Sequence, residues 1–181
     1  METGGQADSS MMLDALAADG SFPAWRKQLD LFGQFVGSWD IDGRFFRRDG
    51  TLETRYRGEW HFGWVLEGRA VQDVLIRPSR SLRGPGESSW EYGTTLRVFD
   101  PDSGGWLVIW IAPVSFGFVN LIGRAHEEEI WIEGHGPEGD LYRWVFSDIT
   151  ADRFLWQGSQ SGDGGKSWFR GHEMIASRKR G

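Results

Sequence analysis

From residue 37 onward, hydrophobic and polar residues alternate in short segments that Gly, Asp and Pro separate. The clearest case is 52–62, where charged residues or histidine occupy every second position and Tyr56, Trp60 and Phe62 lie among the others. A repeat of two residues is typical of a β-strand with one solvent-facing side and one buried side. The same pattern predicts about ten antiparallel strands, at 37–46, 52–62, 68–77, 90–99, 105–112, 116–125, 129–134, 141–148, 153–159 and 167–177.

Short strands at regular spacing are typical of a β-sandwich or a closed barrel. The chain also carries 11 tryptophans, enough for a large aromatic interior. We therefore expect an all-β fold, an antiparallel barrel with an N-terminal helix closing one end. That helix is predicted over 23–36, where Trp25, Leu29, Phe32 and Val36 recur every three or four residues.

The remaining segments define the domain organisation. Residues 1–20 are expected to be disordered or weakly helical, and 21–177 to form a single barrel domain. Residues 178–181 form a basic C-terminal tail. The stretch 78–89, rich in Ser, Arg, Gly and Pro, predicts a long flexible loop.

Composition narrows the possible functions. The net charge of −6 disfavours nucleic acid as a partner, because binding its phosphates requires a basic surface. The chain has no cysteine, which excludes disulfides, zinc–thiolate sites and thiol nucleophiles. The N-terminus does not resemble a signal peptide, and no apolar run is long enough to span a membrane. We expect a soluble cytoplasmic protein without membrane association.

The segment 105–111 (GWLVIWI) is apolar on both faces of its predicted strand. The face that does not point into the barrel needs a cover, which the predicted helix or a partner subunit can supply. We therefore expect that the protein can form a homodimer.

A known pattern occurs at Gly37-Ser38-Trp39, directly after the predicted helix. Gly-x-Trp at the start of the first barrel strand resembles the signature of the lipocalins and the wider calycin group. In that family the Trp packs across the base of the barrel under a basic residue from the end of the last strand. The resemblance implies that Arg170 or Arg178 has this role here.

From about residue 35 onward the chain resembles the bacterial lipocalin-like barrels of unknown function. It shares with them the Phe-Asp-Pro turn at 99–101 before a Trp-rich strand, and a Ser-x-Asp-Gly-Gly-x-Ser-Trp hairpin at 161–168. The hairpin motif also fits the Asp-box of sialidase propellers. A single copy is interpreted as a structural turn in which an Asp accepts backbone N–H groups and glycines adopt positive φ.

The aromatic residues indicate a binding cavity. If Trp39 faces inward, parity places Ile41 and Phe45 inside as well, and the polar face of 52–62 turns its aromatic face inward. Large rings with N–H or O–H groups can line a small-ligand cavity that also has a few polar partners. The alternative is that the rings simply fill the barrel. The predicted ligand-binding residues are Tyr56, Trp60, Tyr92, Trp110, Asn120, Trp144, Trp156 and His172.

Two residues are candidates for catalysis. His172 shares one face of the last predicted strand with Arg170 and Met174, and it becomes an interior hydrogen-bonding group or a general base if that face points inward. Asp73 is the second candidate. It is either a paired interior charge or an exposed residue with Gln72, Val74 and Ile76 inside, and we expect the exposed position. No pair of histidines has the spacing of a metal site, so we expect no metal and no cofactor.

Three functions remain open at this point. The first is a protein that binds a small hydrophobic or aromatic molecule inside the barrel. The second is a cofactor-independent isomerase, cyclase or hydrolase that acts on a hydrophobic metabolite, with His172 or Asp73 moving protons. The third is an interaction protein with a filled barrel.

Overall fold

The computed structural model describes residues 5–136 and 138–180. These residues form two α-helices, two 3₁₀ helices and eleven strands, which turns and loops connect. The helices are α1 (Gly5–Leu16), η1 (Pro23–Trp25), α2 (Arg26–Gly33) and η2 (Arg80–Leu82). The strands are β1 (Ala17–Ala18), β2 (Gly37–Phe46), β3 (Leu52–Val65), β4 (Ala70–Arg77), β5 (Glu91–Asp100), β6 (Gly105–Ala112), β7 (Gly117–His126), β8 (Glu129–His135), β9 (Leu141–Ser147), β10 (Arg153–Ser161) and β11 (Phe169–Arg178).

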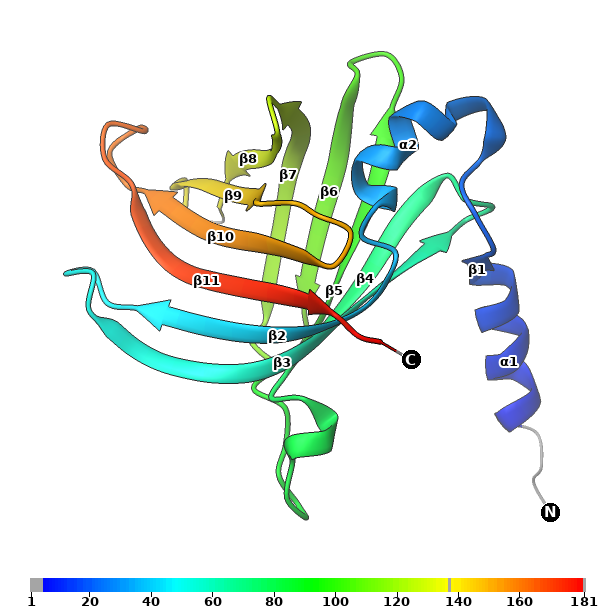
Figure 1. Cartoon of the computed structure of the whole chain (residues 1–181), viewed down its shortest axis with the longest axis horizontal. Coiled ribbons are helices and arrows are strands. Elements are labelled where there is room, and N and C mark those ends of the chain that lie inside the picture. Colours follow the sequence, from blue (N-terminus) through cyan, green and yellow to red (C-terminus); the bar gives the residue numbers. More distant parts are fainter. Residues whose placement is uncertain (1–4, 137, 181) are drawn as a thin grey trace.

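Strands β2 to β11 form a closed antiparallel barrel in which each strand pairs with the next along the chain (Figure 1). The pairing of β11 with β2 closes the barrel. The two-residue strand β1 pairs antiparallel with the C-terminal end of β3, at Trp64 and Val65. The expected all-β barrel of about ten strands with a helix at one end is therefore confirmed. Closure leaves the ten barrel strands without a free edge.

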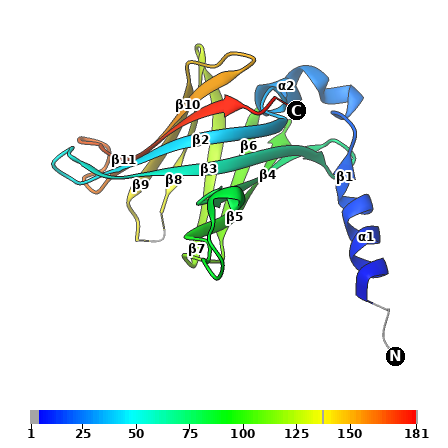
Figure 2. The same ribbon diagram turned by 60° about the horizontal axis from the view of Figure 1, so that its bottom comes forward.

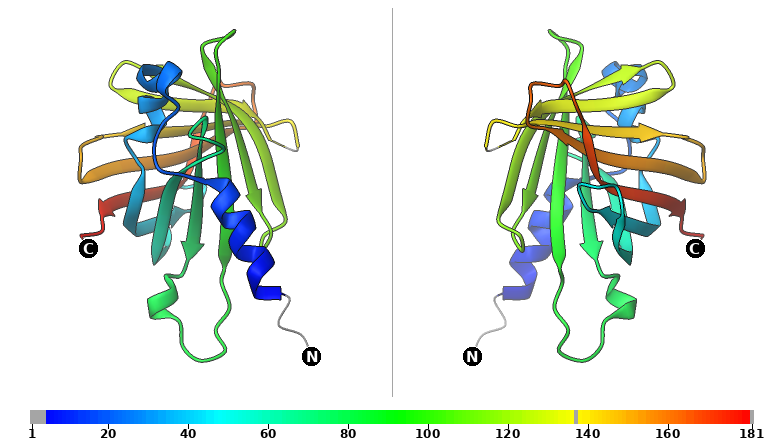
Figure 3. Two further views of the ribbon diagram at one scale, coloured as in Figure 1. Left: turned by 90° about the vertical axis from the view of Figure 1, so that its right-hand side faces the viewer. Right: turned by 90° about the vertical axis from the view of Figure 1, so that its left-hand side faces the viewer.

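Helix α2 lies over one end of the barrel, whereas the β2–β3 and β10–β11 turns extend from the opposite end (Figure 2). Leu29 and Phe32 are the buried residues of α2, as the spacing of its apolar positions predicts. The α-helix is shorter than the predicted span, because η1 forms its first turn. Helix α1 lies outside the barrel wall (Figure 3), and no described helix is long and apolar enough to cross a membrane.

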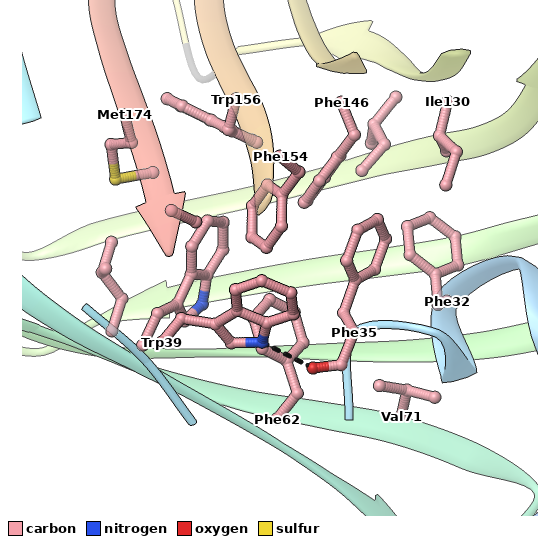
Figure 4. Close-up of a cluster of buried hydrophobic side chains, with 14 of the residues drawn as sticks. Phe32, Phe35, Trp39, Phe62, Val71, Ile130, Phe146, Phe154, Trp156 and Met174 are labelled. Atoms are coloured by element: carbon pink, nitrogen blue, oxygen red, sulfur yellow. Dashed lines mark hydrogen bonds between the residues drawn. The ribbon is translucent and has the colours of Figure 1, made fainter. Parts of the chain in front are cut away.

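The interior at the α2 end is filled with aromatic rings (Figure 4). Phe35 packs at 4.8 Å, centroid to centroid, on both Phe146 and Phe154. Trp39 packs edge-on against Phe154 and donates its indole N–H to the carbonyl of Phe35 over 2.7 Å. Such ring pairs stabilise beyond the apolar area that they bury. Phe35, Trp39, Phe146 and Phe154 are fully buried, so these rings form the packed half of the interior.

The basic residue over Trp39 is Arg178. Its guanidinium lies 4.1 Å from the Trp39 ring centroid and donates to the carbonyls of Val36 and Gln34 over 2.9 and 3.0 Å. Arg178 thus links the last strand to the turn after α2. Arg170 points outward instead, with half of its side chain exposed beside Glu173.

The hairpin at 161–168 is held by Asp163, as the sequence predicts. One carboxylate oxygen accepts from the Ser167 backbone N–H and the Ser161 hydroxyl over 2.9 and 2.8 Å. Gly164 and Gly165 have φ of +73° and +88°, a region that side chains disfavour. These contacts account for the motif as a tight turn.

The register of β4 corrects one expectation. Val71, Asp73 and Leu75 are buried and alternate along the inner face. The prediction that Asp73 is exposed is wrong, and Gln72 and Val74 are only partly buried, whereas Ile76 is buried at 1% exposure. The alternative, that Asp73 is a paired interior charge, holds instead, because Arg97 on the neighbouring strand β5 is its partner.

Candidate ligand-binding cavity

A cavity of about 360 Å³ occupies the half of the barrel away from α2. Its wall comes from eight strands, and its aromatic part carries rings from β2, β3, β6, β9, β10 and β11. The lining residues are Phe45, Trp60, Leu75, Arg77, Glu91, Thr95, Arg97, Trp110, Tyr142, Trp144, Trp156, Gly158, Ser159, Gln160, Phe169, Gly171, His172 and Met174.

Gly158 leaves room for the Trp156 ring in the cavity wall. Gly158 lies between Trp144 on β9 and His172 on β11 in the ladder, so its missing side chain would point inward with theirs. A Cβ there would lie 2.7 Å from the Trp156 ring. The Trp156 ring therefore occupies the volume that a larger residue at 158 would need.

An irregularity in β11 places His172 at the cavity. Gly158 pairs with His172, but Ser159 pairs with Arg170, so Gly171 is an extra residue in β11. A bulge of this kind breaks the alternation of faces along a strand. As a result Phe169 and His172 both line the cavity, while Arg170 points outward.

Tyr56 and His172 form the central polar pair. The Tyr56 hydroxyl and Nε2 of His172 lie 2.6 Å apart. Burial lowers the pKa of His172 to about 3, and the nearby Arg77 charge acts in the same direction. Burial raises the pKa of Tyr56 to about 12, with Arg77 opposing it. Both side chains are therefore neutral at neutral pH.

Stacked rings hold the imidazole in place. The Phe45 ring stacks on His172 with centroids 4.2 Å apart, and Trp156 meets it edge-on at 5.1 Å. Tyr56 also lies against Phe45, at 5.5 Å. These contacts restrict the imidazole, so the orientation of its second nitrogen is constrained by the packing.

A buried ion pair joins β4 and β5. Arg97 donates to one carboxylate oxygen of Asp73, and the backbone N–H of Thr95 donates to the other over 3.2 Å. Asp73 and Arg97 are each only 1% exposed. The Arg97 guanidinium also lies 5.2 Å from the Phe32 ring and 5.3 Å from the Phe62 ring, at the boundary with the filled half.

A second ion pair lies toward the open end. Arg77 donates to Glu91 over 3.2 Å, and the Ser115 hydroxyl donates to the same carboxylate oxygen over 3.0 Å. The Arg77 guanidinium lies 5.0 Å from the Phe45 ring and 5.3 Å from the Tyr56 ring. Arg77 therefore connects this ion pair to the Tyr56–His172 pair.

Most of the predicted ligand-binding residues lie together. The cavity wall includes five of them. Tyr56 does not line the cavity, but its hydroxyl contacts His172, which does. The five are Trp60, Trp110, Trp144, Trp156 and His172.

Two predicted residues face the other way, so their assignment to the interior is wrong. Tyr92 is 41% exposed because Glu91 and Gly93 are the inward positions on either side of it. A Cβ on Gly93 would meet the Trp110 ring, which occupies that inner position. Asn120 is exposed because its neighbours Val119 and Leu121 are buried inside.

The sequence reasoning did not identify the partners of these interior charges. A signal was available, because Asp73 and Arg77 share one face of a predicted strand and Glu91 and Arg97 share one face of the next. Charges of opposite sign at facing positions of consecutive strands indicate paired interior groups when both flanks are apolar. Among the residues that the structure describes, no cluster of His, Asp and Glu could hold a metal ion.

No protein-family model and no curated protein matches the chain. Among solved structures, the chain is similar to the S-type phycobiliprotein lyase CPES from Guillardia theta, with a TM-score of 0.60 and 11% identity over 84% of this chain and 92% of that chain. A redesigned β-barrel, b11L5F_LGL, aligns with a TM-score of 0.32 and 12% identity over 81% of this chain and 93% of that chain. Together with the closed barrel, the first likeness confirms the lipocalin-like fold expected from Gly37 and Trp39.

Proposed function

We propose that the protein binds a small hydrophobic or aromatic molecule in the cavity of its barrel. The observation that carries this proposal is the division of the interior into a filled half and a hollow half lined by aromatic rings. A cavity of this size is within the range of small-molecule sites, in which apolar walls supply affinity and a few polar groups set orientation. The likeness to the lyase supports the fold, whereas the ligand class follows from the lining residues.

Tryptophan fluorescence tests the proposal directly, because Trp60, Trp110, Trp144 and Trp156 line the cavity. Titration with an uncharged naphthalene derivative should quench and shift the emission in a saturable manner. The matched control is Gly158→Val, whose side chain would force the Trp156 ring into the cavity. Saturable binding by the native protein that Gly158→Val weakens at least tenfold supports the proposal, whereas equal binding by both proteins contradicts it.

The catalytic roles of His172 and Asp73 stay predictions. The lowered pKa of His172 makes its neutral imidazole a weak general base. The carboxylate of Asp73 already accepts hydrogen bonds from Arg97 and from the Thr95 backbone N–H. Binding is therefore the function that the geometry supports best.

We also propose that a second copy of the chain covers the outer apolar patch, which comprises Tyr92, Leu107, Ile109, Ile111 and Phe118. Phe118 is 58% exposed, and Ile111 pairs directly with it across β6 and β7. The patch contains no charged side chain, so two chains of net charge −6 can meet there without placing like charges in contact. A chain without cysteine also suits a reducing compartment, and the cytoplasm is the location we propose.

A further inference from the structure

The charged groups of the cavity cancel one another. Arg77 pairs with Glu91, and Arg97 pairs with Asp73. His172 and Tyr56 are neutral at neutral pH because burial disfavours their charged forms. The wall therefore carries two cations, Arg77 and Arg97, and the carboxylate of Glu91, while Asp73, which does not line the cavity, pairs with Arg97. A charged ligand would lose its hydration on entering the cavity and would find no unpaired side chain of opposite charge there.

The polar groups of the wall that lack a partner are hydrogen-bond donors. The indole N–H of Trp60 and the Nε of both Arg77 and Arg97 are buried and have no partner among the described residues. All three side chains line the cavity. Polar groups that have lost water are normally satisfied by an acceptor, which an apolar hydrocarbon cannot supply.

The hydrogen bond of Tyr56 determines which nitrogen of His172 carries the proton. Either group of this 2.6 Å contact can donate, and we assign the donor role to the phenol, because a neutral imidazole nitrogen is more basic than a phenol oxygen. Because the phenol donates to Nε2, the single proton of the neutral imidazole lies on Nδ1. No acceptor for Nδ1–H occurs among the described residues, and the imidazole lines the cavity.

We propose that the ligand is an uncharged aromatic molecule with a hydrogen-bond acceptor, such as a carbonyl oxygen, which receives the Nδ1–H of His172. The aromatic body lies among the tryptophan rings, and the acceptor lies beside Phe45 and Trp156, the two rings that pack against the imidazole. This inference rests on the proposed function and specifies its ligand class.

Three naphthalene probes separate the possibilities. 2-Acetylnaphthalene is uncharged and has an acceptor, 2-ethylnaphthalene is slightly smaller and lacks the acceptor, and 2-naphthoate has a charged acceptor. Dissociation constants are measured at pH 7.5 by tryptophan fluorescence and calorimetry. We expect the ketone to bind at least tenfold more tightly than the carboxylate, because the site has no unpaired cation.

Variants of the polar pair test the role of His172. His172→Phe should weaken ketone binding by about three- to tenfold, the net effect of one hydrogen bond, and should leave ethylnaphthalene binding unchanged. The double variant Tyr56→Phe/His172→Phe should give the same result without an unpaired phenol, so it serves if the single variant folds poorly.

The outcomes distinguish the two proposals. Carboxylate binding equal to or tighter than ketone binding overturns the inference and leaves small-molecule binding intact. A ketone that loses no affinity in either His172 variant also overturns the inference alone. If none of the three probes binds to the native protein, both the inference and the proposed function are wrong.

Discussion

The hydroxyl of Tyr56 on β3 lies 2.6 Å from Nε2 of His172 on β11, although 116 positions separate the two residues in the chain. Strand β2 lies between their strands, and its residue Phe45 contacts both rings. The pair therefore forms only when the barrel closes through the pairing of β11 with β2. The polar centre of the cavity depends on the correct assembly of three strands.

The buried imidazole should make stability dependent on pH. The pKa of His172 is about 3 in the folded protein against 6.5 for an ordinary histidine, so the unfolded chain binds the proton first as the pH falls. Its stabilising contribution is complete above about pH 6.5 and is lost as the pH falls toward 3, by at most about 1.4 kcal/mol per pH unit.

Urea unfolding between pH 7.5 and 4.5 measures this slope. The free energy of unfolding of the native protein should fall more steeply with decreasing pH than that of Tyr56→Phe/His172→Phe, which lacks the titrating group. The phenol of Tyr56, with its pKa raised to about 12, does not titrate in this range, and the remaining ionisable groups are shared, so the difference between the two curves isolates His172. Parallel curves would contradict a buried neutral imidazole.

Breaking the interior ion pair of Asp73 and Arg97 should lower the free energy of unfolding strongly. Asp73→Ala leaves the guanidinium of Arg97 buried without its carboxylate, and we expect a loss of about 3–5 kcal/mol in the free energy of unfolding. The matched control is Asp40→Ala, which removes an exposed partner of Lys179 and should cost less than about 1 kcal/mol. Chemical denaturation gives both values, and similar small losses would show that the interior pair tolerates the loss of its carboxylate.

Removing the side chain over Trp39 should loosen the closed end of the barrel. Arg178→Ala loses the cation–π contact and the hydrogen bonds to the turn after α2, so we expect a loss of about 2–4 kcal/mol. Arg170→Ala, on the same strand but exposed, should change stability by no more than about 0.5 kcal/mol. Thermal unfolding of the two variants distinguishes their roles, and equal stability would contradict the assignment to Arg178.

A charge in the outer apolar patch should separate the proposed dimer. In light scattering coupled to size-exclusion chromatography, the native protein should have twice the mass of one chain. Ile111→Lys should reduce that mass to a single chain, because it would bury two like charges at a symmetric interface. Thr51→Lys, in the exposed β2–β3 turn, is the control and should leave the mass unchanged. A native protein with the mass of one chain contradicts the dimer.

Local patterns predicted the parts of the fold that depend on short stretches of chain. The alternation in 52–62 fixed the inner face of β3, and Tyr56, Trp60 and Phe62 are all buried. The Gly-x-Trp at 37–39 located the start of the barrel. These patterns were reliable because one face of β3 carries charges, which leaves only one way to orient the strand.

Strands with apolar or mixed faces could not be oriented in the same way. On β4 and β7 both faces are apolar enough to be inside, so Asp73 and Asn120 were each assigned to the wrong face. On β11 the bulge at Gly171 changes the parity between Arg170 and His172, and a count of alternate positions does not reveal it.

The sequence by itself determined the barrel, the helix at its end and the aromatic character of its interior, because hydrophobic periodicity and turn residues act over a few neighbouring positions. The tertiary structure decided that one half of the interior is filled and the other hollow. It also decided that two arginines lie inside with their carboxylates and that His172 meets Tyr56. These features depend on the register between strands, through which residues distant in the chain come to share the same space.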